Sequence, residues 1–153
     1  MHVYDIIYII ISGGFCLSLR FDVRMKEREA LLMNSLQLAY TGDAVWELIV
    51  RVELIRRGFN VHHMHQKCVG LVNAKSQAAI LQALQSSLNE SEAEIVKRGR
   101  NAHAKHPSPK HQQPDDYAAS TGFEALLGFL YLTGQDERIR QLIETIKEEN
   151  LYV

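Results

Sequence analysis

Apolar residues recur at intervals of three and four positions along most of the chain after residue 25. This spacing collects them on one face of an α-helix, as in an amphipathic helix that packs against a core. No strand ladder is needed to account for the pattern, so the sequence predicts an all-α protein, a helical bundle without internal repeats. In the stretch 44–58 the apolar positions that follow the spacing are Val45, Leu48, Ile49, Val52 and Ile55.

The predicted helices are separated by recognisable signals. Ser91 and Glu94 have the spacing of a capping box, which predicts the start of a helix there. All three prolines lie within eight residues inside the segment 103–116, which therefore cannot continue a helix and is expected to be a long exposed loop. The helical pattern resumes at about Ser120, and a final amphipathic helix is expected over about 136–148.

The composition is that of an ordinary globular domain. The chain has 153 residues, of which 46% are hydrophobic and 23% charged, and its formal net charge is −1. A chain of this size builds a core without metal or disulfide staples. Its two cysteines, Cys16 and Cys68, form no metal-ligand spacing, so a reducing, cytoplasmic setting is expected. The near-zero net charge means that any nucleic-acid binding must come from local clusters of charge.

Residues 1–24 differ from the remainder of the chain. Their apolar stretch, 6–11, is far shorter than the roughly 20 residues that a membrane-spanning helix needs. The only charge before that stretch is Asp5, whereas a signal peptide has positive charge there. We therefore expect residues 1–24 to be a poorly ordered or adventitious extension, with a short strand or an oligomer contact as the alternative. A single catalytic domain is expected over residues 25–153.

Two carboxylates stand within otherwise apolar helical segments. Asp43 lies in LAYTGDAV and Glu124 in STGFEALLGF. An unpaired carboxylate is costly to bury, so each needs a partner. Taken singly, each could be a helix N-terminal charge favoured by the helix dipole. If the two helices pack together, the carboxylates converge in a partly apolar site that suits Mg²⁺.

Four segments, in their order and intervals, carry a resemblance to a known family. They are LAYTGDAVWE, VNAKSQAAIL, EIVKRGRNA and STGFEALLGFLYL. Over about residues 34–150 the sequence resembles the ribonuclease III endonuclease domain, most closely the small members that lack a separate double-stranded-RNA-binding domain. The resemblance implies that Asp43 and Glu124 hold a catalytic Mg²⁺. Larger members of the family have two further carboxylates where this chain has Ala39 and Thr121. Glu47 is expected to pair with Arg51 instead of joining the site.

The activity implied by the resemblance is Mg²⁺-dependent hydrolysis of double-stranded RNA to 5′-phosphate and 3′-hydroxyl ends, in the maturation of 23S ribosomal RNA. Mg²⁺ would lower the pKa of a bound water and stabilise the departing oxygen, so no nucleophilic side chain is needed. Two alternatives stay open. Ala39 and Thr121 favour a catalytically weak double-stranded-RNA-binding dimer, and a third class is an all-α adaptor in which both carboxylates are merely helix caps.

A basic arm is predicted between the third and fourth of these segments. Residues 95–113 contain five Lys or Arg residues and no Asp or Glu, which suits the phosphates of an RNA duplex. The alternative is a solvated helix end favoured by the helix dipole. The resemblance adds Lys75 and, less strongly, Ser76 as phosphate contacts. The RNA-binding set is Lys75, Lys97, Arg98, Arg100, Asn101 and Lys105, with Lys110 also in the arm.

A homodimer is expected as well. The helical segment that contains Glu124 has apolar groups on nearly every face, and this surface needs a cover. The resemblance implies a symmetric pairing that sets two active sites across the minor groove, so that each cuts one strand. The apolar residues in question are Leu126, Phe129, Leu130, Tyr131 and Leu132.

Overall fold

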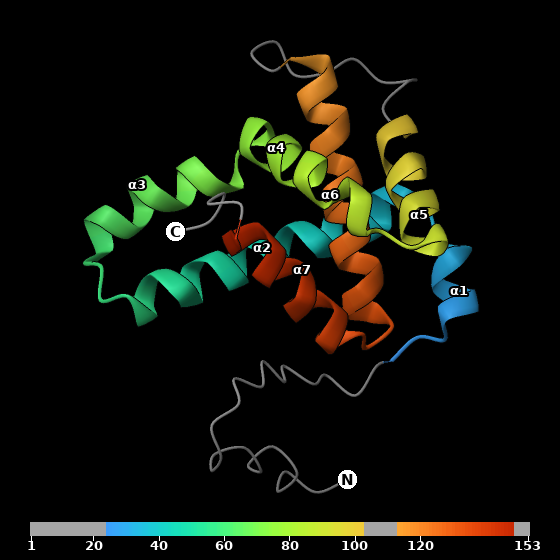
Figure 1. Cartoon of the computed structure of the whole chain (residues 1–153), viewed down its shortest axis with the longest axis horizontal. Coiled ribbons are helices and arrows are strands. Elements are labelled where there is room, and N and C mark those ends of the chain that lie inside the picture. The colour runs from blue at the N-terminus through green and yellow to red at the C-terminus, as the bar shows by residue number, and fades with distance from the viewer. Residues whose placement is uncertain (1–23, 103–112, 149–153) are drawn as a thin grey trace, which may run out of the picture.

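The computed structural model describes residues 24–102 and 113–148 (Figure 1). No strand occurs in these two ranges, which confirms the all-α prediction. Lys105, Lys110 and, apart from Arg24, the predicted extension 1–24 lie outside the described residues. The elements, in chain order, are α1 (Glu27–Leu31), α2 (Ser35–Arg56), α3 (Val61–Val72), α4 (Ala74–Leu84), the 3₁₀ turn η2 (Gln85–Ser87), α5 (Glu90–Asn101), α6 (Pro114–Leu132) and α7 (Asp136–Glu148).

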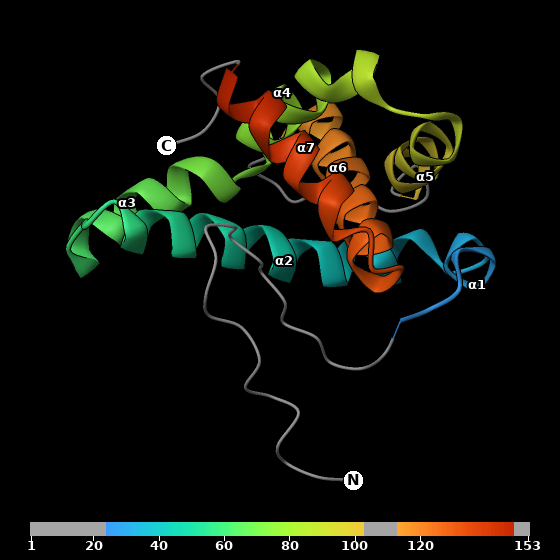
Figure 2. The ribbon, with the colours of Figure 1, turned by 60° about the horizontal axis from the view of Figure 1, so that its bottom comes forward.

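Helix α6 is the centre of the fold. Helices α2, α4, α5 and α7 pack around it, while α3 folds back along the second half of α2 (Figures 1 and 2). A helix that is apolar on all sides belongs in the interior of a domain. Leu126, Phe129 and Leu130 are accordingly buried by the chain itself. The argument for a dimer from an uncovered face at these residues is therefore wrong, because this chain's own helices cover them.

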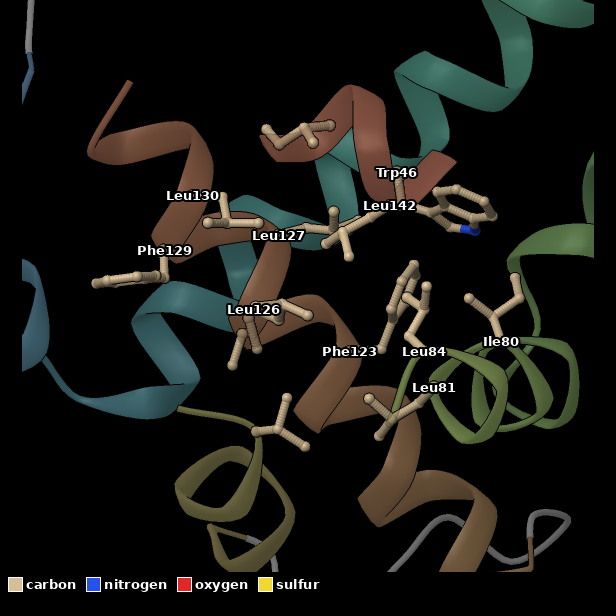
Figure 3. Close-up of a cluster of buried hydrophobic side chains, with 14 of the residues drawn as sticks. Trp46, Ile80, Leu81, Leu84, Phe123, Leu126, Leu127, Phe129, Leu130 and Leu142 are labelled. Atoms are coloured by element: carbon tan, nitrogen blue, oxygen red, sulfur yellow. The ribbon is translucent and has the colours of Figure 1, made fainter. Parts of the chain in front are cut away.

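The core is densest where α2, α4 and α6 meet. Figure 3 shows Trp46 of α2, Phe123 of α6 and Leu84 of α4 gathered in one cluster. The rings of Trp46 and Phe123 pack edge to face, with centroids 5.1 Å apart. The indole Nε1 donates to the carbonyl oxygen of Leu71 over 3.2 Å, which satisfies the polar atom of a fully buried side chain. These contacts fix α2, α4 and α6 relative to one another.

Helices α2 and α6 cross with their backbones in contact. A Cβ atom added to Gly42 would lie 1.7 Å from the carbonyl oxygen of Glu124, and one added to Gly128 would lie 1.9 Å from that of Leu38. Neither distance leaves room for a side chain. The two glycines therefore allow a close crossing, and this crossing sets Asp43 beside α6.

Two helix starts differ from the sequence prediction. The capping box of α5 is formed by Asn89 and Glu92, two residues before the predicted pair. Helix α6 begins at Pro114, six residues before Ser120. Proline is well tolerated in the first turn of a helix, because the N–H group that it lacks would have no hydrogen-bond partner within the helix. Asp115 and Asp116 in the same turn interact favourably with the helix dipole.

Glu92 has a second partner that explains its position. The side chain is 1% exposed and accepts hydrogen bonds from Nε and Nη2 of Arg138 at 2.7 and 2.9 Å. Arg138 also donates to the carbonyl oxygen of Ser87 at 2.5 Å. Burial raises the pKa of Glu92, but Arg138 and the backbone N–H of Asn89 outweigh it and lower the pKa overall. This pair ties α5 and η2 to α7.

Candidate functional site

The close crossing brings the two predicted carboxylates together. Asp43 follows Gly42 on α2, and Glu124 lies on α6 at the point where its own carbonyl oxygen faces Gly42. Asp43 is exposed and Glu124 is half-buried. The crossing thus converts two carboxylates that are 81 positions apart in the sequence into neighbours.

Neither carboxylate is a helix cap. Asp43 is the ninth residue of α2, whose N-cap is Asn34. Glu124 is the eleventh residue of α6, and the acidic residues of that first turn are Asp115 and Asp116. The helix dipole acts within the first turn, so it does not stabilise Asp43 or Glu124. The interpretation of both carboxylates as caps is therefore wrong.

The two carboxylates are electrostatically coupled. Burial raises the pKa of Glu124 to about 7, with a further contribution from the charge of Asp43. The pKa of Asp43 is also raised, first by burial and then by the charge of Glu47. The charge of Asp43 therefore opposes ionisation of Glu124. No cation among the described residues offsets this repulsion.

The neighbouring positions on α2 and α6 add no further ligand. Glu47 pairs with Arg51, as the sequence predicted. Ala39 is buried, and the Thr121 hydroxyl donates to the carbonyl oxygen of Tyr117 at 3.0 Å, within its own helix. The two positions at which larger family members have carboxylates are thus occupied by a methyl group and by a hydroxyl that is already bonded.

A third polar group, which the sequence analysis missed, lies beside Glu124. Gln77 of α4 is 1% exposed, and a hydrogen-bonding interaction of its side-chain amide lowers the pKa of Glu124, against the larger effects of burial and Asp43. The amide approaches the Glu124 carboxyl without reaching the geometry of a normal hydrogen bond. The signal was present in the sequence, because Gln77 shares the core-facing spacing of Ile80, Leu81 and Leu84.

These donors fit a magnesium ion. Mg²⁺ is commonly held by one or two carboxylates, with waters and substrate phosphate as its other ligands. Asp43 and Glu124 supply two carboxylates that repel each other, and no described cation lies between them. A bound divalent ion would relieve this repulsion. In the ranges 24–102 and 113–148 no group of three or more His, Cys, Asp or Glu side chains is placed to hold a metal. Water and substrate would therefore have to complete the coordination.

The predicted RNA-binding residues that the structure describes fall into an exposed group and a group that is hydrogen-bonded within the fold. In the exposed group, Lys97, Arg100 and Asn101 line a pocket of about 370 Å³ together with apolar residues such as Leu81 and Leu88. Lys75 is exposed at the start of α4.

Arg98 and Ser76 are engaged within the fold. Both terminal nitrogens of Arg98 donate to backbone carbonyls, those of Leu31 and Met33, at 2.5 Å. The Ser76 hydroxyl donates to the carbonyl oxygen of Gly70 at 2.6 Å. Arg98 thus ties α5 to the connection between α1 and α2, and its RNA contact stays a prediction.

The raised pKa of Glu124 predicts that the metal-free protein becomes less stable as the pH rises. In the unfolded chain this carboxyl loses its proton near pH 4.5, whereas in the folded chain it keeps the proton up to about pH 7. The folded state therefore binds more protons between these values, and its stability falls as the pH rises through them. Glu124→Gln should remove this loss and stabilise the metal-free protein at pH 8 by about 1–3 kcal/mol.

Urea denaturation in EDTA at pH 5 and pH 8 measures this effect. At pH 5 the parent protein and Glu124→Gln should have nearly equal free energies of unfolding, and the variant should gain only at the higher pH. A variant that is destabilised equally at both pH values would contradict the assignment of the carboxyl to this buried, like-charged environment.

No described helix is both long and apolar enough to cross a membrane. The comparisons with known proteins agree with the fold. The family model for the Ribonuclease III domain matches residues 36–135. A Mini-ribonuclease 3 from Symbiobacterium thermophilum is 46% identical over 121 residues, which cover 78% of this chain and 92% of that protein. A Mini-ribonuclease 3 from Enterococcus faecalis is 40% identical over 119 residues, which cover 76% of this chain and 89% of that protein.

A crystal structure of a Fusobacterium nucleatum protein superposes with a TM-score of 0.72 at 28% identity, covering 82% of this chain and 99% of that one. A ribonuclease III domain defines the class, so the protein is an endoribonuclease. Within that class the chain belongs to the Mini-ribonuclease 3 family. The resemblance inferred from the four sequence segments is thereby confirmed.

Proposed function

We propose that the chain is a magnesium-dependent endoribonuclease that cleaves double-stranded RNA. The observation that carries this proposal is the pairing of Asp43 and Glu124 at the α2–α6 crossing. Burial and the charge of Asp43 raise the pKa of Glu124 there, and no cation among the described residues offsets this effect. An isolated acidic pair of this kind destabilises the fold, so it needs a role that outweighs the cost.

In this proposal Asp43 and Glu124 would be the two protein ligands of the ion, Glu124 after losing the proton that burial and the charge of Asp43 favour. Mg²⁺ bound there would lower the pKa of a coordinated water and polarise the scissile phosphate. Gln77, beside Glu124, and Ala39, one turn before Asp43 on α2, are both buried. The expected ends are a 5′-phosphate and a 3′-hydroxyl.

The substrate that we propose is a duplex stem of the 23S ribosomal RNA precursor, in the cytoplasm. The family resemblance supports this choice of stem, and the basic residues at the end of α5 support duplex RNA as the class. Phosphates and 2′-hydroxyls dominate recognition of duplex RNA, and Lys75, Lys97, Arg100 and Asn101 offer exposed donors to them.

We propose that the active form is a homodimer, paired through the start of α2. Leu32 and Tyr40 are 81% and 86% exposed, and Leu36 lies one turn before Tyr40 on the same helix. These apolar groups lie close in sequence to Asp43, so a second copy docked there would set two sites near each other. Light scattering tests the expected mass of two chains.

Purified protein incubated with a long RNA duplex, with Mg²⁺ or with EDTA, tests the proposed activity. Cleavage in Mg²⁺ that stops in EDTA supports it. Binding without cleavage would favour the catalytically weak double-stranded-RNA-binding dimer, and neither binding nor cleavage would contradict both.

Removing charge from the end of α5 should weaken RNA binding regardless of sequence. Lys97→Gln combined with Arg100→Gln keeps the long side chains, which matters because the Arg100 stem packs against Gly122. Each lost phosphate contact should lower the slope of log K against log salt by roughly 0.7–0.9. Filter binding to duplex RNA at several salt concentrations measures this slope.

The matched control is Arg56→Gln with Arg57→Gln, which removes the same charge from the far end of α2 (Figure 1). That pair should change the slope less. Equal slopes for the parent and the α5 variant would identify the α5 end as a solvated surface only.

A further inference from the structure

The polar side chain of Gln77 has no hydrogen bond of normal geometry within the described fold. Both of its amide atoms, Oε1 and Nε2, are buried without a hydrogen-bond partner. Among the residues that the structure describes, no other has a buried side-chain nitrogen or oxygen without a hydrogen-bond partner. Buried polar groups are almost always paired in native proteins, so an orphaned amide calls for an explanation.

Packing does not explain it. Gln77 lies on the face of α4 that also bears Ile80, Leu81 and Leu84, and this face packs against α6. A leucine or methionine would fill the same space and leave no polar atom unsatisfied. The amide is therefore retained at a cost to stability.

The position of Gln77 indicates what the amide is for. The amide acts on Glu124, which lies on α6, the helix against which α4 packs. An amide carries both a donor and an acceptor, and an ionised carboxylate accepts hydrogen bonds only. The waters that Mg²⁺ retains are hydrogen-bond donors, and they lack a carboxylate partner at Ala39 and Thr121.

We propose that Gln77 is a positioning residue of the metal site, whose Nε2 orients the Glu124 carboxylate and whose Oε1 accepts a hydrogen bond from a water of the bound ion. This inference rests on the proposed function, because it requires Asp43 and Glu124 to be the ligands. It gives both orphaned atoms of the amide a partner in the metal-bound state. It also assigns the role of the missing carboxylates to a third helix, α4.

The test is Gln77→Leu, with Gln82→Leu as the matched control on an exposed position of the same helix. Mg²⁺ affinity is measured without RNA, from the melting temperature over a Mg²⁺ series and by calorimetry. Gln77→Leu should bind Mg²⁺ about 10–100-fold more weakly, as is typical when a group that orients a metal ligand is removed. Its metal-free melting temperature should be equal to or higher than that of the parent.

A purely structural glutamine predicts the opposite pattern, a lower metal-free melting temperature with unchanged Mg²⁺ affinity, and that result would overturn the proposal. Gln77→Met provides a flexible replacement of similar volume if the leucine variant does not fold. A direct signature comes from NMR: the side-chain amide resonances of Gln77 should shift as Mg²⁺ is added to the parent and should not shift in Asp43→Asn.

The same titrations separate this inference from the proposed function. If the parent binds Mg²⁺ in a manner that depends on Asp43, but Gln77→Leu binds it equally well, the role of Gln77 is wrong and the metal site stands. If Mg²⁺ does not bind to the parent, or binds equally to Asp43→Asn, the proposed function fails and the role of Gln77 fails with it.

Discussion

Asp43→Asn should lower the rate of Mg²⁺-dependent cleavage of duplex RNA by about 10²–10³-fold or more while leaving the fold intact. The substitution preserves the shape of the side chain and removes the charge that would hold the ion, and losses of this size follow when one electrostatic partner of a transition state is removed. Asp43 is exposed and forms no ion pair with a described cation, so folding does not depend on its charge.

Single-turnover cleavage with circular dichroism on the same samples measures both properties. The matched control is Asp136→Asn, which makes the same substitution in the first turn of α7, where losing the charge should cost at most about 1 kcal/mol of helix-dipole stabilisation. That variant should cleave at close to the parent rate. Full cleavage by Asp43→Asn would refute the metal-ligand assignment.

The double variant Asp43→Asn with Glu124→Gln sharpens the same test. Residues that hold one ion act as a unit, so the losses of the two single variants should not add. RNA binding should persist in all three variants, and at low Mg²⁺ it should improve because a carboxylate no longer repels the phosphate. A double variant whose loss equals the product of the single losses would indicate two independent roles.

The helical class and the acidic pair were accessible from the sequence because their signals are local. Apolar spacing of three and four positions predicts helices segment by segment, and Asp43 and Glu124 are conspicuous as charges in apolar segments. Their convergence required an assumption that the two helices pack together. The structure supplies the physical basis of that convergence, the absence of a Cβ at Gly42 and Gly128.

Residues defined by tertiary contacts were less accessible. A charge run cannot reveal that Arg98 turns inward to the carbonyl oxygens of Leu31 and Met33, more than 60 positions away. An apolar helix such as α6 does not reveal from its own sequence whether the same chain or a second copy covers it. Gln77 was missed for a related reason, since glutamine in a helix is usually solvated and only the apolar spacing around it marks a core position.

The α2–α6 crossing predicts the largest effect on stability. Gly42→Ala places a Cβ 1.7 Å from the backbone carbonyl oxygen of Glu124, and a backbone atom cannot move aside as the end of a flexible side chain can. The helices must separate, which disturbs the packing of Trp46 against Phe123. We expect a loss of about 3–5 kcal/mol in the free energy of unfolding, a large part of the total for a domain of this size.

The control for that loss is Gly70→Ala, the same substitution inside helix α3. A Cβ at Gly70 meets nothing within 4 Å, so alanine should stabilise the protein there by about 0.5–1 kcal/mol through its higher helix propensity. Urea denaturation in EDTA compares the two variants. Any folded Gly42→Ala protein should also have Asp43 and Glu124 farther apart, so the pKa of Glu124 should fall towards its ordinary value and Mg²⁺ should bind more weakly. Equal stability of the two alanine variants would show that the helices do not cross in contact at Gly42, and it would remove the physical basis for the convergence of Asp43 with Glu124.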